Sequence, residues 1–181
     1  AEVAVADNSQ QALAAGASLD AVSAGLESLT PVAGRFNLQQ LPDGVTVIDD
    51  TYNANPESMG AALAMLAATA PGPGGRRIAV LGDMLELGDH GQASHAALRD
   101  AVVAAKTDLV FACGPLMGHL WRQLPDSVKA VHETVAGDLM VPLAGQIRGG
   151  DVIMVKGSLG SAMGPLVTGL QVRFSDTAEN L

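Results

Sequence analysis

Apolar runs and stretches with helical spacing alternate along most of this chain. Five short runs rich in Val, Ile and Leu have the length of buried strands; they lie at residues 45–50, 78–81, 109–113, 128–132 and 151–155. Between them, apolar residues recur every three or four positions, which predicts helices; these cover 56–70, 92–106, 116–124 and 135–147, and a last one opens at 156–158 and runs to about 170. This alternation predicts an α/β domain, with a doubly wound, mostly parallel sheet and helices on both faces.

Smaller features of the pattern refine this prediction at its ends. Pro142 predicts a break or a kink in the fourth helix, because proline cannot donate a helical hydrogen bond. The run 128–132 is expected near an edge of the sheet, residues 171–174 are expected to add a short strand, and the tail from Ser175 is expected to be loose.

The first residues follow a different pattern from the rest. Residues 8–29 have the spacing of two short helices, and the Pro- and Gly-containing segment 30–34 is typical of a linker. We therefore predict a domain boundary there, with a helical segment at 1–34 and the α/β domain at 35–181. Because the chain starts at Ala1 without an initiator Met, we expect a fragment or a processed chain.

Composition narrows the function classes. The 181 residues carry a net charge of −9 and no run of Lys or Arg, which disfavours nucleic-acid binding. Cys113 is the only cysteine, so a disulfide framework and a Cys-based zinc site are excluded, and a reducing cytoplasm is the expected setting. No apolar run approaches the roughly 20 residues that span a membrane, and no signal peptide is visible.

Three polar loops follow predicted strands, at residues 49–55, 82–88 and 156–161. The carboxyl ends of parallel strands meet at one edge of a sheet, which is where ligands bind in such folds. The sequence therefore predicts a ligand site at this edge, built from all three loops.

The first loop has the richest chemistry. Asp50 could accept hydrogen bonds from a ribose diol, or serve only as a turn or capping residue. Tyr52 could stack on a base or be a half-buried loop aromatic. Asn53 and Asn55 could bind a base edge or a peptide, although a helix cap is favoured for Asn55 because it precedes Pro56.

The other two loops offer an anion site and two carboxylates. Lys156 together with backbone N–H groups at a helix start could bind an anion, and Gly157 would let the backbone approach it; the alternative is a capped helix with a solvated lysine. Asp83 and Glu86 could bind a metal or another cation, but a turn carboxylate and a solvated glutamate are favoured. His95, on an apolar helix face, is expected to be structural, and Cys113 is expected to be inert.

Four segments of the sequence closely resemble the C-terminal part of the Mur ligases. They are Gly34-Arg35-Phe36, the stretch from Asp49 to Met59 (DDTYNANPESM), the stretch from Leu81 to Gly88 (LGDMLELG), and Val155-Lys156-Gly157-Ser158. The second and third segments point to the MurF type. The resemblance covers about residues 8–170, and it implies a Rossmann-like three-layer fold.

The resemblance also implies an activity. Enzymes of this type use ATP and Mg²⁺ to join D-alanyl-D-alanine to UDP-N-acetylmuramoyl-tripeptide through an acyl phosphate, in cytoplasmic peptidoglycan synthesis. The UDP-binding domain and most of the central ATPase domain would be absent from this chain, and residues 1–34 would be the helical tail of the ATPase domain. ATP and Mg²⁺ would be bound mainly by those absent parts, and no metal ligand is expected here.

Roles for individual residues follow from the same resemblance. Arg35 would approach the ATP phosphates, Asp50 would hold the ribose, and Tyr52, Asn53 and Asn55 would line the nucleotide and substrate side. Lys156, Gly157 and Ser158 would face the incoming D-alanyl-D-alanine, with help from the loop 114–117. Arg35 and Lys156 are thus the expected catalytic residues.

Two features depart from the family pattern, and two other functions stay open. Leu159 stands where family members often have Arg, and no Gly-x-x-x-x-Gly-Lys-[Ser/Thr] phosphate loop occurs. We therefore expect the chain to be inactive alone.

The alternatives are a non-catalytic nucleotide or small-ligand module of flavodoxin-like or receiver-like type, and a structural or regulatory fragment. A receiver would need an Asp at the end of the third strand, where Cys113 stands.

Overall fold

A computed structural model of the chain describes residues 34–178. The helices predicted within 8–29, and the domain boundary predicted at 30–34, lie outside the described residues except for Gly34. No helix within the described part is both long enough and apolar enough to cross a membrane.

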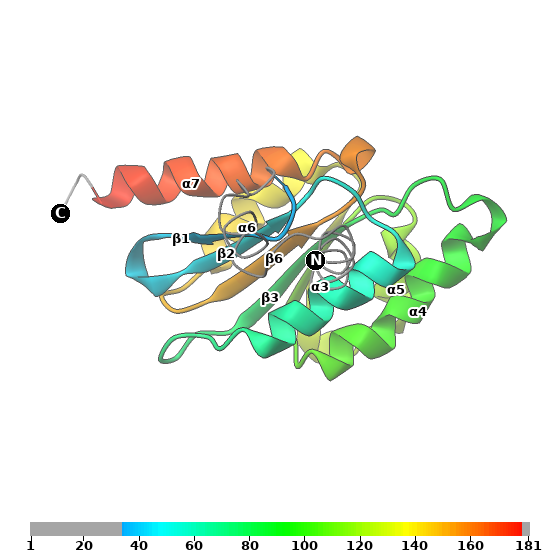
Figure 1. The fold of residues 1–181 in the computed structure, drawn as a ribbon, viewed down its shortest axis with the longest axis horizontal. Coiled ribbons are helices and arrows are strands. Elements are labelled where there is room, and N and C mark those ends of the chain that lie inside the picture. Colours follow the sequence, from blue (N-terminus) through cyan, green and yellow to red (C-terminus); the bar gives the residue numbers. More distant parts are fainter. Residues whose placement is uncertain (1–33, 179–181) are drawn as a thin grey trace, which may run out of the picture. The chain divides into compact units, whose positions relative to one another are not determined.

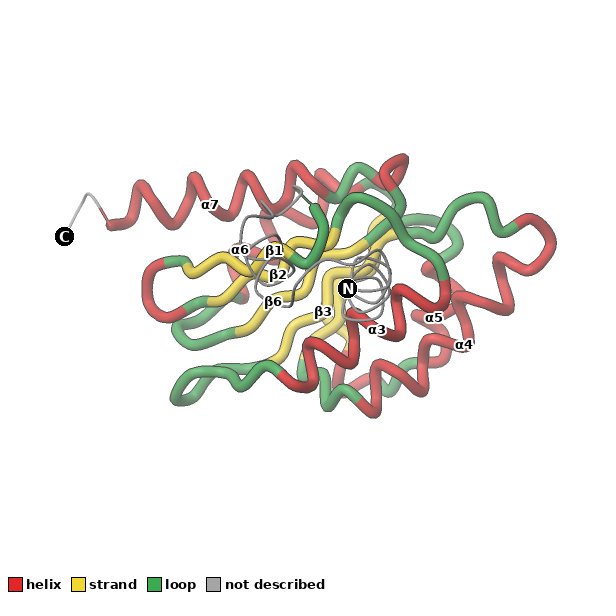
Figure 2. The backbone as a smooth tube through the Cα atoms, viewed as in Figure 1, coloured by secondary structure: helices red, strands yellow, loops and turns green. Residues whose placement is uncertain are grey.

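The described residues form a six-stranded sheet with the strand order β1-β2-β6-β3-β4-β5. The edge strand β1 runs antiparallel to β2, and all other neighbours are parallel (Figures 1 and 2). The strands are β1 (Asn37–Gln40), β2 (Thr46–Asp50), β3 (Arg77–Gly82), β4 (Leu109–Cys113), β5 (Lys129–Glu133) and β6 (Val152–Lys156). The mostly parallel, doubly wound sheet is confirmed, and β5 lies at an edge as predicted.

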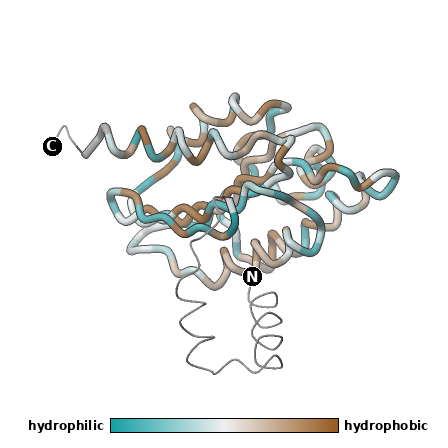
Figure 3. Tube along the Cα trace, turned by 45° about the horizontal axis from the view of Figure 1, so that its top comes forward, coloured by the Kyte–Doolittle hydropathy of each residue, from teal (hydrophilic) through white to brown (hydrophobic). Residues whose placement is uncertain are grey.

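Helices cover both faces of the sheet, so the predicted three-layer architecture is also confirmed. On one face lie α3 (Pro56–Ala68), α4 (Gly91–Ala104) and α5 (Met117–Gln123), and on the other lie α6 (Met140–Gln146) and α7 (Gly164–Ala178). Successive strand residues point to opposite faces, so Ile48 packs under α3 while Val47 packs under α7. Apolar residues therefore run continuously along the central strands (Figure 3).

The structure corrects the predicted elements in three places. Strand β1 is not predicted, because three of its four residues are polar and backbone pairing with β2 holds it. Residues 171–174 belong to α7 and not to a strand, and the tail continues as helix to Ala178. The helix predicted at 135–147 is divided, but ahead of Pro142, into a 3-10 helix at Ala136–Leu139 and α6; Pro142 lies in the first turn of α6, where its missing N–H costs nothing.

A buried carboxylate fixes the amino end of the central strand β6. Asp151 is fully buried and accepts hydrogen bonds from the backbone N–H groups of Arg76 at 2.8 Å and Arg148 at 2.9 Å. The guanidinium of Arg76 adds an ion pair of 2.8 Å. These contacts hold the turn before β6 to the turn before β3, at the sheet edge opposite the predicted site.

Candidate functional site

The strand order brings the three predicted polar loops together. Lys156 at the end of β6 pairs with Asp50 of β2 on one side and with Leu81 of β3 on the other. The two neighbouring strands, β2 and β3, are followed by helices on the α3 face of the sheet, whereas β6 is followed by α7 on the opposite face. The carboxyl end of β6 is therefore a topological switch point, the place where open α/β sheets bind ligands.

Lys156 is not the solvated lysine that the sequence allows. Its side chain is only 2% exposed, and Nζ lies 2.5 Å from Oδ2 of Asp50 and donates a second bond of 2.8 Å to the carbonyl oxygen of Asn53. The ring of Phe36 lies 6.0 Å from Nζ. The ammonium is thus enclosed by the loop that follows β2.

Asp50 is equally enclosed. The whole residue is 5% exposed. Its Oδ1 accepts a hydrogen bond of 3.4 Å from the backbone N–H of Phe36, which is longer than the contact of Oδ2 with Lys156. Burial raises the pKa of the Asp50 carboxyl above its usual value, although Lys156 and the Phe36 N–H act in the opposite direction. Lys156 therefore favours the ionised form of this carboxyl, against the effect of burial.

Ser158 connects the loops on either side of β6. Its Oγ accepts a bond of 2.9 Å from the backbone N–H of Leu85 and donates a longer one of 3.4 Å to the carbonyl oxygen of Ala54. Its own N–H donates to the carbonyl oxygen of Asp83 at 3.0 Å. Ser161, which has no distinctive sequence signal, donates to the same oxygen at 2.9 Å. One network therefore joins all three loops.

Asp83 has the turn role and Glu86 the solvated position that the sequence favours. The carboxylate of Asp83 accepts bonds from the backbone N–H groups of Leu116 at 3.2 Å and Met117 at 2.7 Å, which caps the start of α5. Glu86 is exposed and takes a left-handed backbone conformation, with φ of 65°. Among the described residues, no group of three or more His, Cys, Asp or Glu side chains could hold a metal ion.

His95 has a structural role, as predicted from its helix face. The imidazole is fully buried, its Nε2 lies 2.9 Å from the backbone N of Met84, and its Nδ1 lies 2.6 Å from the carbonyl oxygen of Gly91. Nε2 must accept from the Met84 N–H, so the proton resides on Nδ1 and the ring is neutral. His95 therefore fastens the loop after β3 to α4.

The segment 156–158 does not open a long helix, which corrects the predicted element, while the anion site proposed there stays a prediction. A 3-10 turn at Leu159–Ser161 follows it, and α7 begins only at Gly164. The space beside Gly157 is filled by Met163 and by the backbone of Gly82, so its missing side chain serves loop packing.

Alanine at position 157 is expected to lower the unfolding free energy by about 1 to 3 kcal/mol through overpacking. The new Cβ would lie 2.7 Å from Cγ of Met163 and 3.1 Å from Cα of Gly82, and the backbone atom cannot move aside. Gly160→Ala is the matched control, because its Cβ would meet only the half-exposed side chain of Leu85. Urea denaturation checks the difference; equal stability of both variants would contradict the packing role.

Arg35 and Tyr52 are predicted site residues that are exposed and contact each other. The Arg35 guanidinium lies 4.3 Å from the centre of the Tyr52 ring, and both residues are exposed. Within the described part of the chain, Arg35 has no ion-pair partner. Asn53 is exposed too, with its Oδ1 accepting from the N–H of Ala54 at 2.8 Å. Asn55 caps α3, as favoured from the sequence.

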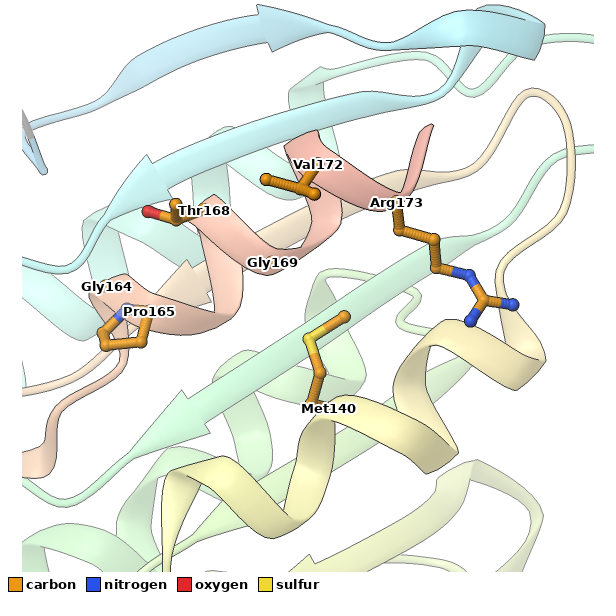
Figure 4. A pocket seen from close by; sticks show the side chains of 7 residues that line it. All are labelled: Met140, Gly164, Pro165, Thr168, Gly169, Val172 and Arg173. Atoms are coloured by element: carbon orange, nitrogen blue, oxygen red, sulfur yellow. The ribbon is translucent and has the colours of Figure 1, made fainter. Parts of the chain in front are cut away.

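Two cavities open beside these loops. One of about 360 Å³ lies between the ends of β3, β4 and β5 and the turn after β6, and its lining includes Asp83, Gly114, Thr134 and Ser161. Another of about 540 Å³ lies between the end of β2 and α7, beside Asp49 and Tyr52. A larger, mostly apolar cavity of about 1000 Å³ lies between α6 and α7, where Met140 reaches toward Gly169 (Figure 4). None of the predicted site residues lines that third cavity.

The thiol of Cys113 is expected not to react with Ellman's reagent at pH 8 in the folded chain. Burial raises the pKa of Cys113 to about 11, with a further contribution from the nearby Asp83 carboxylate. At pH 8 the thiol is therefore protonated, and only the thiolate is nucleophilic. One equivalent of reagent should react after denaturation, because Cys113 is the sole cysteine. Rapid labelling of the folded chain would contradict an inert role.

Comparisons with known proteins assign the chain to a family. The family described as "Mur ligase, glutamate ligase domain" matches residues 34–159. A UDP-N-acetylmuramoyl-tripeptide–D-alanyl-D-alanine ligase of Escherichia coli (strain K12) is 42% identical over 102 residues, covering 56% of this chain and 22% of that protein. The ligase of the same name from Mycobacterium tuberculosis (strain CDC 1551 / Oshkosh) is 32% identical over 179 residues, covering 88% of this chain and 35% of the relative.

A solved structure extends the match to three dimensions. The MurF ligase from Thermotoga maritima in complex with ADP superimposes with a TM-score of 0.75 at 25% identity, covering 92% of this chain and 36% of that one. The chain thus spans about a third or less of the length of these proteins. Because the family matches most of the described domain, and because relatives above 30% identity cover nearly the whole chain, this chain belongs to the Mur ligase family and carries its C-terminal domain.

Proposed function

We propose that this chain is the lid of an ATP-dependent ligase that adds D-alanyl-D-alanine to UDP-N-acetylmuramoyl-tripeptide. The curated relatives carry that name, and the solved MurF structure contains ADP. The observation that carries the proposal is the meeting of all four family segments at the carboxyl edge of the sheet. Residues 34–36, the end of β2, the end of β3 and the end of β6 lie there in contact.

The nucleotide side of the proposed site is the loop after β2. The exposed guanidinium of Arg35 has donors available for phosphate oxygens, and the Tyr52 ring beneath it holds its position. Asp50 accepts from the N–H of Phe36, next to Arg35, and a ribose hydroxyl could donate to it beside the ammonium of Lys156. Asn53 and Asn55 complete the exposed rim of this loop, although the Asn55 side chain also caps α3.

The dipeptide side of the proposed site is the cavity of about 360 Å³. Its volume is at the lower end of the range for small-molecule sites, which suits a ligand of dipeptide size. Gly114 and Pro115 of the loop at 114–117 line it, as do Gly160 and Ser161 of the turn at Leu159–Ser161. Small side chains and backbone groups dominate its lining. Such a lining suits D-alanyl-D-alanine, which has two methyl side chains and one peptide bond.

The chemistry explains why a lid is needed. A bare carboxylate resists attack by an amine because oxide is a poor leaving group, and transfer of a phosphoryl group from ATP supplies a better one. What remains is to hold two anions and an amine in line, and to exclude water from the acyl phosphate. In this proposal Arg35 contributes charge stabilisation, and the loops of this domain contribute orientation.

The other substrates and the metal belong to the rest of the ligase. The described residues contain no metal cluster, so we assign Mg²⁺ and most contacts to ATP to the central domain. Residues 1–34 are, in this proposal, the helical tail of that domain. A cytoplasmic setting follows from the nucleotide substrates, and it agrees with the free thiol of Cys113.

The chain alone is expected to release no phosphate from ATP in the presence of UDP-N-acetylmuramoyl-tripeptide and D-alanyl-D-alanine. The sequence contains no phosphate-binding loop of its own that could cradle ATP. A coupled phosphate assay, with a complete ligase of the family as positive control, makes the measurement. Release that depends on both substrates would show that the chain is a complete enzyme and not a lid.

A further inference from the structure

Resting on this proposed function, we propose that Lys156 and Ser158 are positioning residues for the nucleotide-binding loop, and not contacts for the incoming dipeptide. The resemblance assigns both residues to the dipeptide. Their contacts in the structure point instead to the loop at 51–55, which carries Tyr52 and Asn53.

The ammonium of Lys156 has no room for a second anion. Two of its contacts, at 2.5 and 2.8 Å, go to Asp50 and to the carbonyl oxygen of Asn53, and the Phe36 ring faces it at 6.0 Å. Its side chain is 2% exposed. A dipeptide carboxylate could reach Nζ only by displacing Asp50, which would leave a buried carboxylate without its counter-ion.

The contacts of Lys156 also fix the conformation of the proposed nucleotide-binding loop after β2. Lys156 holds Oδ2 of Asp50 while the N–H of Phe36 holds Oδ1, so the carboxylate has one orientation. The bond to the Asn53 carbonyl fixes the backbone next to Tyr52, whose ring supports Arg35. Lys156 therefore sets the geometry of Asp50, Tyr52 and Arg35, without contacting ATP itself.

Ser158 extends this control to the loop after β3. In the sheet, β2 and β3 are separated by β6, so their loops cannot pair directly. The Ser158 hydroxyl bridges them by accepting from the N–H of Leu85 and donating to the carbonyl of Ala54. The hydroxyl thus donates its proton to one loop and accepts a hydrogen bond from the other, so it holds the two loops together.

The test is a comparison of KM values in the full-length ligase that carries this domain. Lys156→Met keeps an unbranched side chain but removes the charged amino group, and Ser158→Ala removes one hydroxyl. Arg99→Ala, on the exposed face of α4, is the control. We expect Lys156→Met to raise the KM for ATP by about tenfold or more, with the KM for D-alanyl-D-alanine changed by less than about twofold. Ser158→Ala should shift the same constant in the same direction, by less.

The double variant Asp50→Asn with Lys156→Met tests the stability effect alone. Replacing both charged partners should restore the melting temperature that Lys156→Met lowers. A raised KM for D-alanyl-D-alanine at unchanged KM for ATP, in Lys156→Met or in Ser158→Ala, would overturn the inference. If Lys156→Met does not fold, Ser158→Ala decides by the same criterion. Failure of the unaltered enzyme to use the dipeptide would contradict the proposed function instead.

Discussion

Replacing Lys156 with alanine is expected to lower the unfolding free energy of the domain by about 3 to 5 kcal/mol, the cost of breaking a buried ion pair from one side. The carboxylate of Asp50 would stay buried, 5% exposed, with only a long bond from the Phe36 N–H. The carbonyl oxygen of Asn53 would lose its donor as well. Urea denaturation of the 181-residue chain, followed by circular dichroism, measures the loss.

The control for this variant is Arg99→Ala. Arg99 forms an ion pair of 2.7 Å with its neighbour Asp100, but both side chains are well exposed, so its removal should leave the denaturation midpoint unchanged. An equally small effect of Lys156→Ala would show that the Asp50–Lys156 pair adds nothing to stability, and that Asp50 is solvated in solution.

Asp151→Ala is expected to cost a similar amount, about 3 to 5 kcal/mol. The fully buried carboxylate accepts from the backbone N–H groups of Arg76 and Arg148 and pairs with the Arg76 guanidinium. Alanine would leave two backbone donors without their acceptor and would remove the counter-ion from a guanidinium that is 18% exposed. The same denaturation experiment measures the effect.

The two buried pairs lie at opposite ends of β6, and this separates stability from function. Asp151 lies at the amino end, far along the strand from the candidate site, whereas Lys156 lies within it. In the full-length ligase, Asp151→Ala should therefore lower the melting temperature while leaving the KM for ATP unchanged. A shift in that KM as large as the shift from Lys156→Met would show that general loosening of β6 explains both.

Most of the fold could be predicted, because each buried strand is a continuous apolar run followed by a helical repeat. Strand β1 escaped prediction because only Leu38 among its four residues is apolar, and its register comes from β2. Residues 171–174 were expected as a strand, yet Leu166, Leu170 and Phe174 share one face of α7 and pack on the sheet. These residues form a helix because its apolar face packs on the sheet, and the local sequence pattern of residues 171–174 does not reveal that contact.

The position of the candidate site could also be predicted, but the state of its residues could not. Parallel topology alone places the loops after β2, β3 and β6 at one edge. Whether Lys156 is solvated or buried depends on Asp50, a partner 106 residues away in the sequence. The role of Gly157 likewise depends on Met163 and Gly82, which no spacing rule connects to it. Long-range contacts, which local sequence does not encode, decided these roles.

Measuring the joining of D-alanyl-D-alanine to UDP-N-acetylmuramoyl-tripeptide by the full-length ligase, with and without residues 35–181, tests the lid assignment most directly. We predict ATP-dependent product from the full-length enzyme, no product when the domain is deleted, and a strongly reduced rate for Arg35→Ala in the intact enzyme. The unchanged rate of an Arg99→Ala enzyme would serve as the control. Product formed at the full rate by the enzyme that lacks this domain would contradict the assignment.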